Sequence, residues 1–154
     1  MAFAALFPGQ GSQSVGMLAD FEEDCPEVKD TFTEASDALG YDLWALAQEG
    51  PAEQLSLTEI TQPLMLTAGV ALYRAWSQAN GQGASYMAGH SLGEYTALTA
   101  AGSLQLADAV QLVRARGQFM QEAVPQGTGA MAAVIGLDDD KIEAVCSQVV
   151  SDTG

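Results

Sequence analysis

One segment of the chain, Ser85-Tyr-Met-Ala-Gly-His-Ser-Leu-Gly-Glu-Tyr95, links a short apolar run to a helical pattern through a serine. The apolar run predicts a strand over 85–88, and the residues after the serine predict a helix. Between them, Gly89-x-Ser91-x-Gly93 has the G-x-S-x-G pattern of a nucleophile elbow, a strained turn that exposes a serine at the end of a strand. Glycine at the two flanking positions allows the strand and the helix to approach each other.

Such a turn offers the Ser91 hydroxyl two sources of stabilisation for a developing negative charge. The backbone N–H of Leu92 lies in the first turn of the helix, and the positive end of the helix dipole lies beneath the serine. This arrangement is typical of acyl transfer through a serine ester. The residues alone leave open a second interpretation, in which the glycines form a strand-to-helix turn without a catalytic role.

The composition is that of one domain with a hydrophobic core and a strongly acidic surface. The chain has 154 residues, 48% of them hydrophobic, and a net charge of -15 from 20 acidic and 5 basic residues. This charge argues against binding to nucleic acids, DNA included, and to anionic membrane surfaces. No apolar run approaches the ~18 residues of a membrane span, and the N-terminal segment lacks the basic residues of a signal peptide. We therefore expect a cytoplasmic protein without a membrane partner.

The chain opens with another candidate strand. Residues 2–7 form an unbroken apolar run of strand length, as in a buried parallel strand. The run is followed by Pro8-Gly-Gln-Gly-Ser-Gln13, in which glycines flank Gln10. Such a loop can direct backbone N–H groups at an anionic ligand, and it can equally be a plain turn.

Helical patterns fill most of the remaining sequence. Proline, acidic residues and glycine mark their ends, and the predicted helices span residues 26–39, 43–48, 52–55, 62–80, 104–124 and 138–149. Trp76 lies on the apolar face of the fourth of these helices and is expected in the core. A glycine and proline break at 125–129 separates the fifth helix from a further predicted strand over 130–135.

These elements predict an α/β fold with a parallel sheet, but only two strands precede the break, too few for a complete sheet. The chemistry is incomplete as well, because a serine nucleophile needs a base, normally a histidine, to accept its proton. His90 is the only histidine, and as the neighbour of Ser91 it projects to a different side. The roles left for His90 are a contact to the substrate and a supporting hydrogen bond within the turn.

Four segments carry a family resemblance. They are Phe7-Pro-Gly-Gln-Gly-Ser-Gln13, Gly89-His-Ser-Leu-Gly-Glu-Tyr95, Arg116-Gly-Gln-Phe-Met-Gln-Glu-Ala-Val-Pro125 and Gly129-Ala-Met-Ala-Ala-Val-Ile-Gly136. In order and spacing they closely resemble the bacterial malonyl-CoA:acyl carrier protein transacylases of fatty acid synthesis. Four motifs in register are more specific than the elbow alone, and the resemblance extends through the whole chain.

The resemblance implies a large α/β-hydrolase-like subdomain with a smaller ferredoxin-like subdomain inserted into it. Residues 1–125 would form the N-terminal part of the large subdomain, and residues 126–154 would form the beginning of the small one. Family members are longer, and they place the catalytic histidine beyond the point that corresponds to Gly154. The chain is therefore expected to be a fragment that lacks this histidine.

The resemblance also implies roles for individual residues. Ser91 would be the nucleophile that takes the malonyl group from malonyl-CoA and passes it to the phosphopantetheine thiol of acyl carrier protein. The backbone N–H groups of Gln10 and Leu92 would form the oxyanion hole, and Gly89 and Gly93 would shape the elbow. No metal and no organic cofactor is implied, because coenzyme A is part of the substrate.

Three further residues would contact the substrate. Arg116 would hold the free carboxylate of the malonyl group in a bidentate pair, a geometry that lysine does not offer. Met131 would line the acyl pocket, and His90 would lie beside the substrate. From the residue patterns alone, Arg116 can also be a solvated surface charge and Met131 a core residue. Arg114 lies two positions from Arg116 on the same predicted helix and would face elsewhere.

Two other functions share the elbow. A serine esterase or thioesterase of the α/β-hydrolase class has the same turn but has no use for a carboxylate clamp at Arg116 or for the Gln10 loop. An inactive fragment would act only by association, through the edge of an incomplete sheet.

Overall fold

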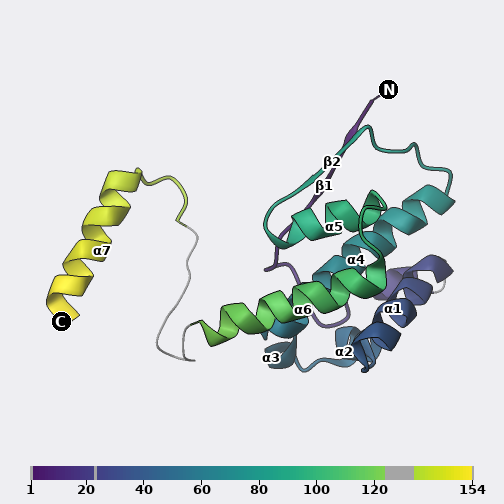
Figure 1. Cartoon of the computed structure of the whole chain (residues 1–154), viewed down its shortest axis with the longest axis horizontal. Helices are drawn as coiled ribbons and strands as arrows, with labels where there is room; N and C mark the ends of the chain where they lie inside the picture. The colour runs from purple at the N-terminus through teal and green to yellow at the C-terminus, as the bar shows by residue number, and fades with distance from the viewer. Residues whose placement is uncertain (1, 23, 124–133, 154) are drawn as a thin grey trace. The chain divides into compact units, whose positions relative to one another are not determined.

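The described part of the chain combines a parallel sheet with helices, as expected for an α/β protein. The computed structural model describes residues 2–22, 24–123 and 134–153 (Figure 1). The chain divides into two units, residues 1–124 and 125–154, and each is described by itself. In chain order the elements are β1 (Ala4–Phe7), the 3₁₀ helix η1 (Ala19–Phe21), α1 (Pro26–Leu39), α2 (Leu43–Glu49), α3 (Ala52–Leu55), α4 (Thr58–Gln78), β2 (Tyr86–Gly89), α5 (Leu92–Ala100), α6 (Leu106–Glu122) and α7 (Asp139–Thr153).

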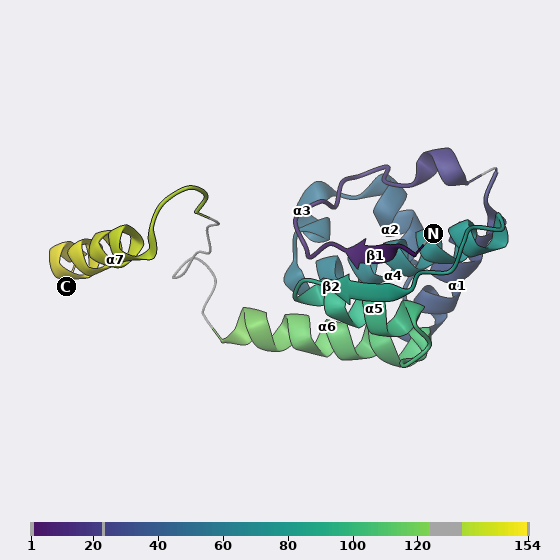
Figure 2. The ribbon, with the colours of Figure 1, turned by 90° about the horizontal axis from the view of Figure 1, so that it is seen from above.

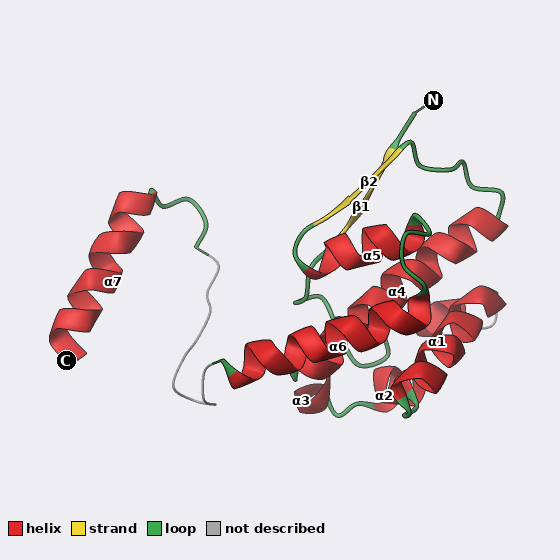
Figure 3. Ribbon diagram, viewed as in Figure 1, coloured by secondary structure: helices red, strands yellow, loops and turns green. Residues whose placement is uncertain are grey.

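β1 and β2 form a two-stranded parallel sheet, drawn in yellow in Figure 3. The register pairs Ala4 with Tyr86 and Phe7 with Gly89. Both strands are predicted from the sequence, and they differ from the prediction only at their ends. Because parallel strands run in the same direction, the loops that follow β1 and β2 both leave the sheet at the carboxyl ends of the strands.

Helices of the first unit cover the sheet on one side and pack on one another. α5 packs against both strands, and α4 packs against α1, α5 and α6 (Figure 2). Fully buried large side chains from these helices include Val28, Phe32, Leu43, Leu64, Leu66, Leu92, Leu106, Val110 and Val113. Within the described ranges, no helix has the length and hydrophobicity that a bilayer crossing requires.

α1 has the bounds that its end signals predict. Pro26 is its first residue, where the missing N–H of proline costs nothing. Gly40 follows its last turn with φ +78°, and the Gly40 N–H donates to the carbonyl of Ser36. A left-handed residue at this position suits glycine, so local sequence alone defines both ends of α1.

α4 begins at Thr58, earlier than the predicted start at Gln62, and therefore contains Pro63 in its interior. The N–H that Pro63 lacks would have bonded the carbonyl of Glu59, which lies in the first turn. Contact with α6 fixes this turn, since a Cβ on Gly117 would lie 2.7 Å from the Cα of Glu59. Tertiary packing thus extends the helix past a residue that locally favours a helix start.

The apolar face of α4 is only partly covered. Leu66 and Val70 are buried, but Trp76 is 51% exposed, so the prediction that Trp76 lies in the core is wrong for the described unit. The indole N–H of Trp76 donates to the carbonyl of Gln82 at 3.0 Å, and its ring meets Phe3 edge-on. These contacts hold the indole at the rim of a groove rather than beneath a covering element.

The second unit contains α7, which begins with acidic residues as predicted and ends beyond the predicted Val149. Most of the predicted strand over 130–135 lies outside the described residues, as does the break at 125–129. Val134 and Ile135, the described end of that segment, are not in a strand. A strand needs a neighbour for its backbone hydrogen bonds, and the described sheet consists of β1 and β2.

Candidate active site

The turn between β2 and α5 has the geometry of a nucleophile elbow. Ser91 has φ +55° and ψ −110°, a conformation that is rare for residues with a side chain. A Cβ on Gly89 would overlap the backbone of Gly93, and a Cβ on Gly93 would overlap the carbonyl of Phe7. Glycine is therefore required at both flanking positions, and the strained turn leaves the Ser91 residue exposed to solvent.

Leu92 is the first residue of α5, so its backbone N–H belongs to the turn that has no intrahelical acceptor. The elbow itself is closed by the Gly93 N–H, which donates to the carbonyl of His90 at 2.9 Å. The Leu92 N–H is thus a hydrogen-bond donor without an intrahelical partner. It lies at the positive end of the helix dipole, next to the Ser91 hydroxyl. This is the arrangement that the sequence predicts for one half of an oxyanion hole.

The loop after β1 lies against the elbow, because Phe7 and Gly89 are paired in the sheet. The His90 N–H donates to the carbonyl of Phe7 at 3.4 Å. A Cβ on Gly9 would lie 3.3 Å from the His90 carbonyl oxygen and 3.5 Å from its Nδ1. The structure therefore brings Gln10, which follows Gly9, to the neighbourhood of Ser91, and the His90 ring lies toward this loop.

Arg116 reaches the elbow from α6. Its Nη2 donates to the Ser91 hydroxyl at 2.9 Å, and its Nη1 donates to the Oε1 of Gln62 at 2.8 Å. The guanidinium also lies 5.7 Å from the centre of the Tyr95 ring, within the range of a cation–π contact. These three contacts fix the direction of the side chain, so the predicted clamp and the predicted nucleophile meet. Arg114 faces elsewhere, since its Nη1 donates to the carbonyl of Leu39.

Gln62 is a site residue that the sequence analysis missed. Its side chain is completely buried, and its Nε2 donates to the Sδ of Met120 at 3.2 Å and to the Oε1 of Gln10 at 3.5 Å. With the bond from Arg116, the amide connects the clamp on α6 to the loop after β1. The sequence predicts Gln62 at the start of a helix, where a polar residue is ordinary. Burial of its side chain is the signal of this role, and burial is not visible in the local sequence.

Met131 lies outside the described residues. Among the described residues, no group of three or more His, Cys, Asp or Glu side chains is arranged to hold a metal ion.

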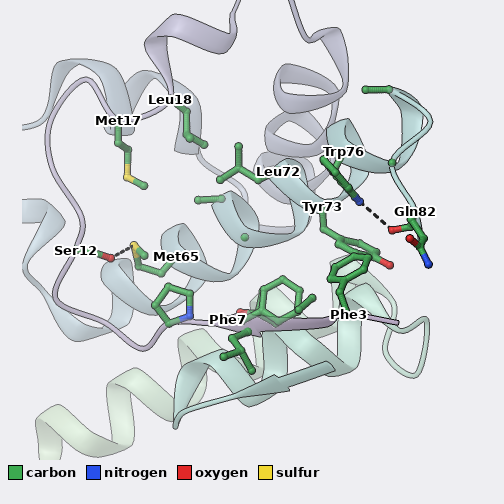
Figure 4. A pocket seen from close by; sticks show the side chains of 18 of the residues that line it. Phe3, Phe7, Ser12, Met17, Leu18, Met65, Leu72, Tyr73, Trp76 and Gln82 are labelled. Atoms are coloured by element: carbon green, nitrogen blue, oxygen red, sulfur yellow. Dashed lines mark hydrogen bonds between the residues drawn. The ribbon is translucent and has the colours of Figure 1, made fainter. Parts of the chain in front are cut away.

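A groove of about 970 Å³ lies between β1 and α4 and is called the β1–α4 groove below. Figure 4 shows Met65, Leu72, Tyr73 and Trp76 of α4 around it. Among the described residues that are predicted to act in the reaction, none lines this groove. The groove and the elbow are therefore separate features of the first unit.

The chain also matches a known protein family over most of its length. Residues 5–152 match the model of the acyl transferase domain. The chain belongs to the acyl transferase domain family. This acyl transferase chain is 64% identical, over 95% of its length, to the malonyl CoA-acyl carrier protein transacylase of Escherichia coli K12, of which the match covers 47%. It is 47% identical to the transacylase of Bacillus subtilis strain 168, with 97% of this chain and 47% of the relative covered.

This acyl transferase chain is also similar to about half of each of two solved structures. An acyl carrier protein S-malonyltransferase from Vibrio cholerae is 55% identical, with a TM-score of 0.87 over 96% of this chain and 48% of that one. A malonyl-transacylase in complex with its type II polyketide synthase acyl carrier protein is 56% identical, with a TM-score of 0.90 over 97% and 48%. The chain thus spans about half the length of the relatives it matches.

Proposed function

We propose that this chain is part of an enzyme that transfers a malonyl group from malonyl-CoA to the phosphopantetheine thiol of an acyl carrier protein, through an ester on Ser91. The observation that carries the proposal is the hydrogen bond from Arg116 to Ser91: a guanidinium, a group suited to pairing with a carboxylate, lies beside the serine of the elbow. Close relatives named malonyl CoA-acyl carrier protein transacylase support it.

In the first half-reaction, the Ser91 oxygen attacks the thioester carbonyl of malonyl-CoA. The carbonyl oxygen becomes an oxyanion, stabilised by the backbone N–H groups of Leu92 and Gln10. The C–S bond then breaks, and the thiol of coenzyme A leaves with the proton that Ser91 gave up. In the second half-reaction, the phosphopantetheine thiol attacks the ester and Ser91 regains its proton.

Arg116 would select the acyl group. In a malonyl ester on Ser91, the free carboxylate lies one methylene beyond the ester carbonyl, close to the guanidinium that now donates to the Ser91 hydroxyl. On acylation, Nη2 would exchange the hydroxyl for this carboxylate while Nη1 remains bonded to Gln62. A second donor from the same fork makes the pair bidentate, and an uncharged acetyl group offers no such partner.

Ser91 also needs a base to accept its proton. The ring of His90, the only histidine of the sequence, lies toward Gly9. We infer that the base belongs to the part of the acyl transferase domain that this chain does not span. The reaction requires no metal and no organic cofactor, and we infer a cytoplasmic location for it.

The finer architecture is part of the same proposal. Residues 1–125 would belong to a large α/β-hydrolase-like subdomain, and residues 126–154 to a small ferredoxin-like subdomain in which Met131 lines the acyl pocket. The unit boundary at residues 124 and 125 supports this division.

A chimera tests the proposed function. In it, this chain replaces the matched part of the E. coli K12 transacylase. After incubation with malonyl-CoA, the intact mass should increase by one malonyl group, and acyl carrier protein with its phosphopantetheine arm should then remove that group. Ser91→Ala should abolish the adduct. Hydrolysis of malonyl-CoA at an equal rate with and without acyl carrier protein would instead identify a thioesterase.

A further inference from the structure

Arg116 carries a positive charge that no carboxylate of the described residues pairs. The chain has 20 acidic and 5 basic residues. Three of the basic residues form ion pairs with acidic side chains: Lys29, Arg74 and Lys141. Arg116 donates instead to two neutral groups, the Oε1 of Gln62 and the hydroxyl of Ser91. Its charge is therefore available to a substrate carboxylate, provided that the contacts holding it in place do not neutralise it.

Tyr95 supplies a contact of this kind. It lies in α5, four residues after Ser91 and thus about one helical turn beyond the elbow. The Cζ of Arg116 lies 5.7 Å from the centre of the Tyr95 ring, and Tyr95 is partly buried against the core cluster of the first unit. An aromatic face fixed in this way attracts a cation through its π electrons and leaves the charge in place.

The contact with the ring uses no N–H donor of Arg116. A guanidinium has five N–H donors in a fixed fork, and the structure commits one on Nη1 to Gln62 and one on Nη2 to Ser91. Because the π electrons of the ring attract the cation as a whole, the other donors stay available for a carboxylate. The ring also limits the directions of a side chain that otherwise has many rotamers.

We propose that Tyr95 is a positioning residue, whose ring holds the guanidinium of Arg116 beside Ser91 so that the site selects a malonyl over an acetyl group. This inference rests on the proposed function, because it concerns the same carboxylate-binding arginine. Tyr95 would act through Arg116 and not on the reacting atoms. Loss of a cation–π contact at a partly buried site corresponds to a fall of about fivefold in kcat/KM.

A second arginine on α6 forms the same type of contact and serves as an internal comparison. The Cζ of Arg114 lies 5.5 Å from the centre of the Tyr41 ring, and Tyr41, like Tyr95, is partly buried against the core cluster. The Nη1 of Arg114, however, donates to the carbonyl of Leu39 and not to a group of the elbow. The two tyrosines thus differ in whether the arginine beside them reaches Ser91.

Two other roles of Tyr95 would give different results. If Tyr95 only fills space in the core, its replacement lowers stability and affects malonyl and acetyl transfer equally. If its hydroxyl binds the substrate, Tyr95→Phe is as defective as Tyr95→Leu. A role of the ring predicts instead that Tyr95→Phe keeps the selectivity and that Tyr95→Leu loses it. Tyr95 does not line the β1–α4 groove, so the walls of that groove keep their side chains in both variants.

The position of Arg116 can be measured without any reaction. The sequence has three arginines, Arg74, Arg114 and Arg116, so nuclear magnetic resonance of the full chain with isotopically labelled arginine gives three Nε–Hε signals, and Arg116→Lys identifies one of them. The ring current of Tyr95 should displace the Arg116 signal. Tyr95→Leu should remove this displacement and make the side chain more mobile, whereas Tyr95→Phe should keep the parent signal. Tyr41→Leu should move the Arg114 signal and leave that of Arg116 in place.

Selectivity is measured in the chimera as the ratio of the acylation rates with malonyl-CoA and acetyl-CoA. Tyr95→Leu should lower kcat/KM for malonyl-CoA by about fivefold and leave the value for acetyl-CoA unchanged. Tyr95→Phe and the control Tyr41→Leu should keep the parent ratio. Urea unfolding of each variant verifies that it is folded.

The outcomes are distinct. The proposal is overturned by an Arg116 signal or a ratio of rates that Tyr95→Leu leaves unchanged, and also by a Tyr95→Phe variant as defective as Tyr95→Leu. If the parent chimera forms no malonyl ester, the proposed function fails, and the resonance comparison alone decides whether Tyr95 holds Arg116.

Discussion

The guanidinium of Arg116 on α6 donates to the hydroxyl of Ser91 at 2.9 Å, although Ser91 lies in the turn before α5, 25 residues earlier in the sequence. The group that would bind a substrate carboxylate is therefore in place beside the nucleophile before any substrate arrives. Gln62 and Tyr95 hold it there from two other directions. Little conformational freedom is left to lose on binding, which favours affinity for the correct acyl group.

Arg116→Ala should separate malonyl from acetyl transfer in the chimera. Loss of one partner of a hydrogen-bonded charge pair costs about 2–5 kcal/mol, so kcat/KM for malonyl-CoA should fall by roughly thirtyfold or more. Activity with acetyl-CoA should stay the same or rise, because acetyl has no carboxylate to pair. Rates of acyl-enzyme formation with both thioesters provide the measurement.

Arg114→Ala is the control for that experiment, since Arg114 bonds the Leu39 carbonyl and faces the Tyr41 ring. It should leave the ratio of malonyl to acetyl rates unchanged. An equal loss with both thioesters in the Arg116→Ala variant would remove the carboxylate-binding role.

Gln62→Leu should lower malonyl transfer by about tenfold or more, since a hydrogen bond to a charged group contributes about 1.5–3 kcal/mol. Leucine fills a similar volume but cannot hold the Nη1 of Arg116. The loss should appear as a lower malonyl-to-acetyl ratio. Thr67→Val is the comparison: Thr67 is buried in the same helix, and its hydroxyl bonds only within the helix, to the Pro63 carbonyl. If both variants shift the ratio equally, Gln62 acts through stability alone.

Gly93→Ala should destabilise the first unit, because the added methyl would overlap the Phe7 carbonyl at the junction of β1 and α5. Overpacking of this kind costs about 1–3 kcal/mol, to be measured by urea unfolding. Gly83→Ala is the reference, since a Cβ there meets nothing within 4 Å and the φ of Gly83 is not in the left-handed region. Equal unfolding midpoints for the two variants would show that the close approach at the elbow is not rigid.

A chain that ends at residue 124 should unfold at nearly the same temperature as the whole chain. The described core cluster extends from Val28 to Val113 and lies entirely in the first unit. Differential scanning calorimetry of both chains gives the comparison. A markedly lower midpoint for the short chain would mean that residues 125–154 contribute to this core.

Much of the fold follows from local signals in the sequence. Pro26 and Gly40 define α1 because each satisfies a backbone requirement of a helix end by itself. The start of α4 could not be predicted in this way, since Pro63 suggests a helix start at the neighbouring Gln62 while contact with Gly117 extends the helix to Thr58.

The residues of the candidate site also differ in whether the local sequence reveals them. Ser91 and its glycines are recognisable because the elbow requires them within a few positions. Arg116 needed the family resemblance, since a single arginine on a helix has no local signature of carboxylate binding. Gln62 escaped detection because its partners Gln10, Arg116 and Met120 are more than 50 residues away in sequence.

The backbone of Ser91, at φ +55° and ψ −110°, has a consequence for the evolution of this domain. A side chain in such a conformation costs about 1–3 kcal/mol, and glycine at position 91 would relieve that strain. Variants selected only for heat resistance would therefore favour Ser91→Gly and lose the hydroxyl in the same step. The residue proposed as the nucleophile thus has a backbone conformation that suits glycine better, and selection for the proposed chemistry would keep serine there.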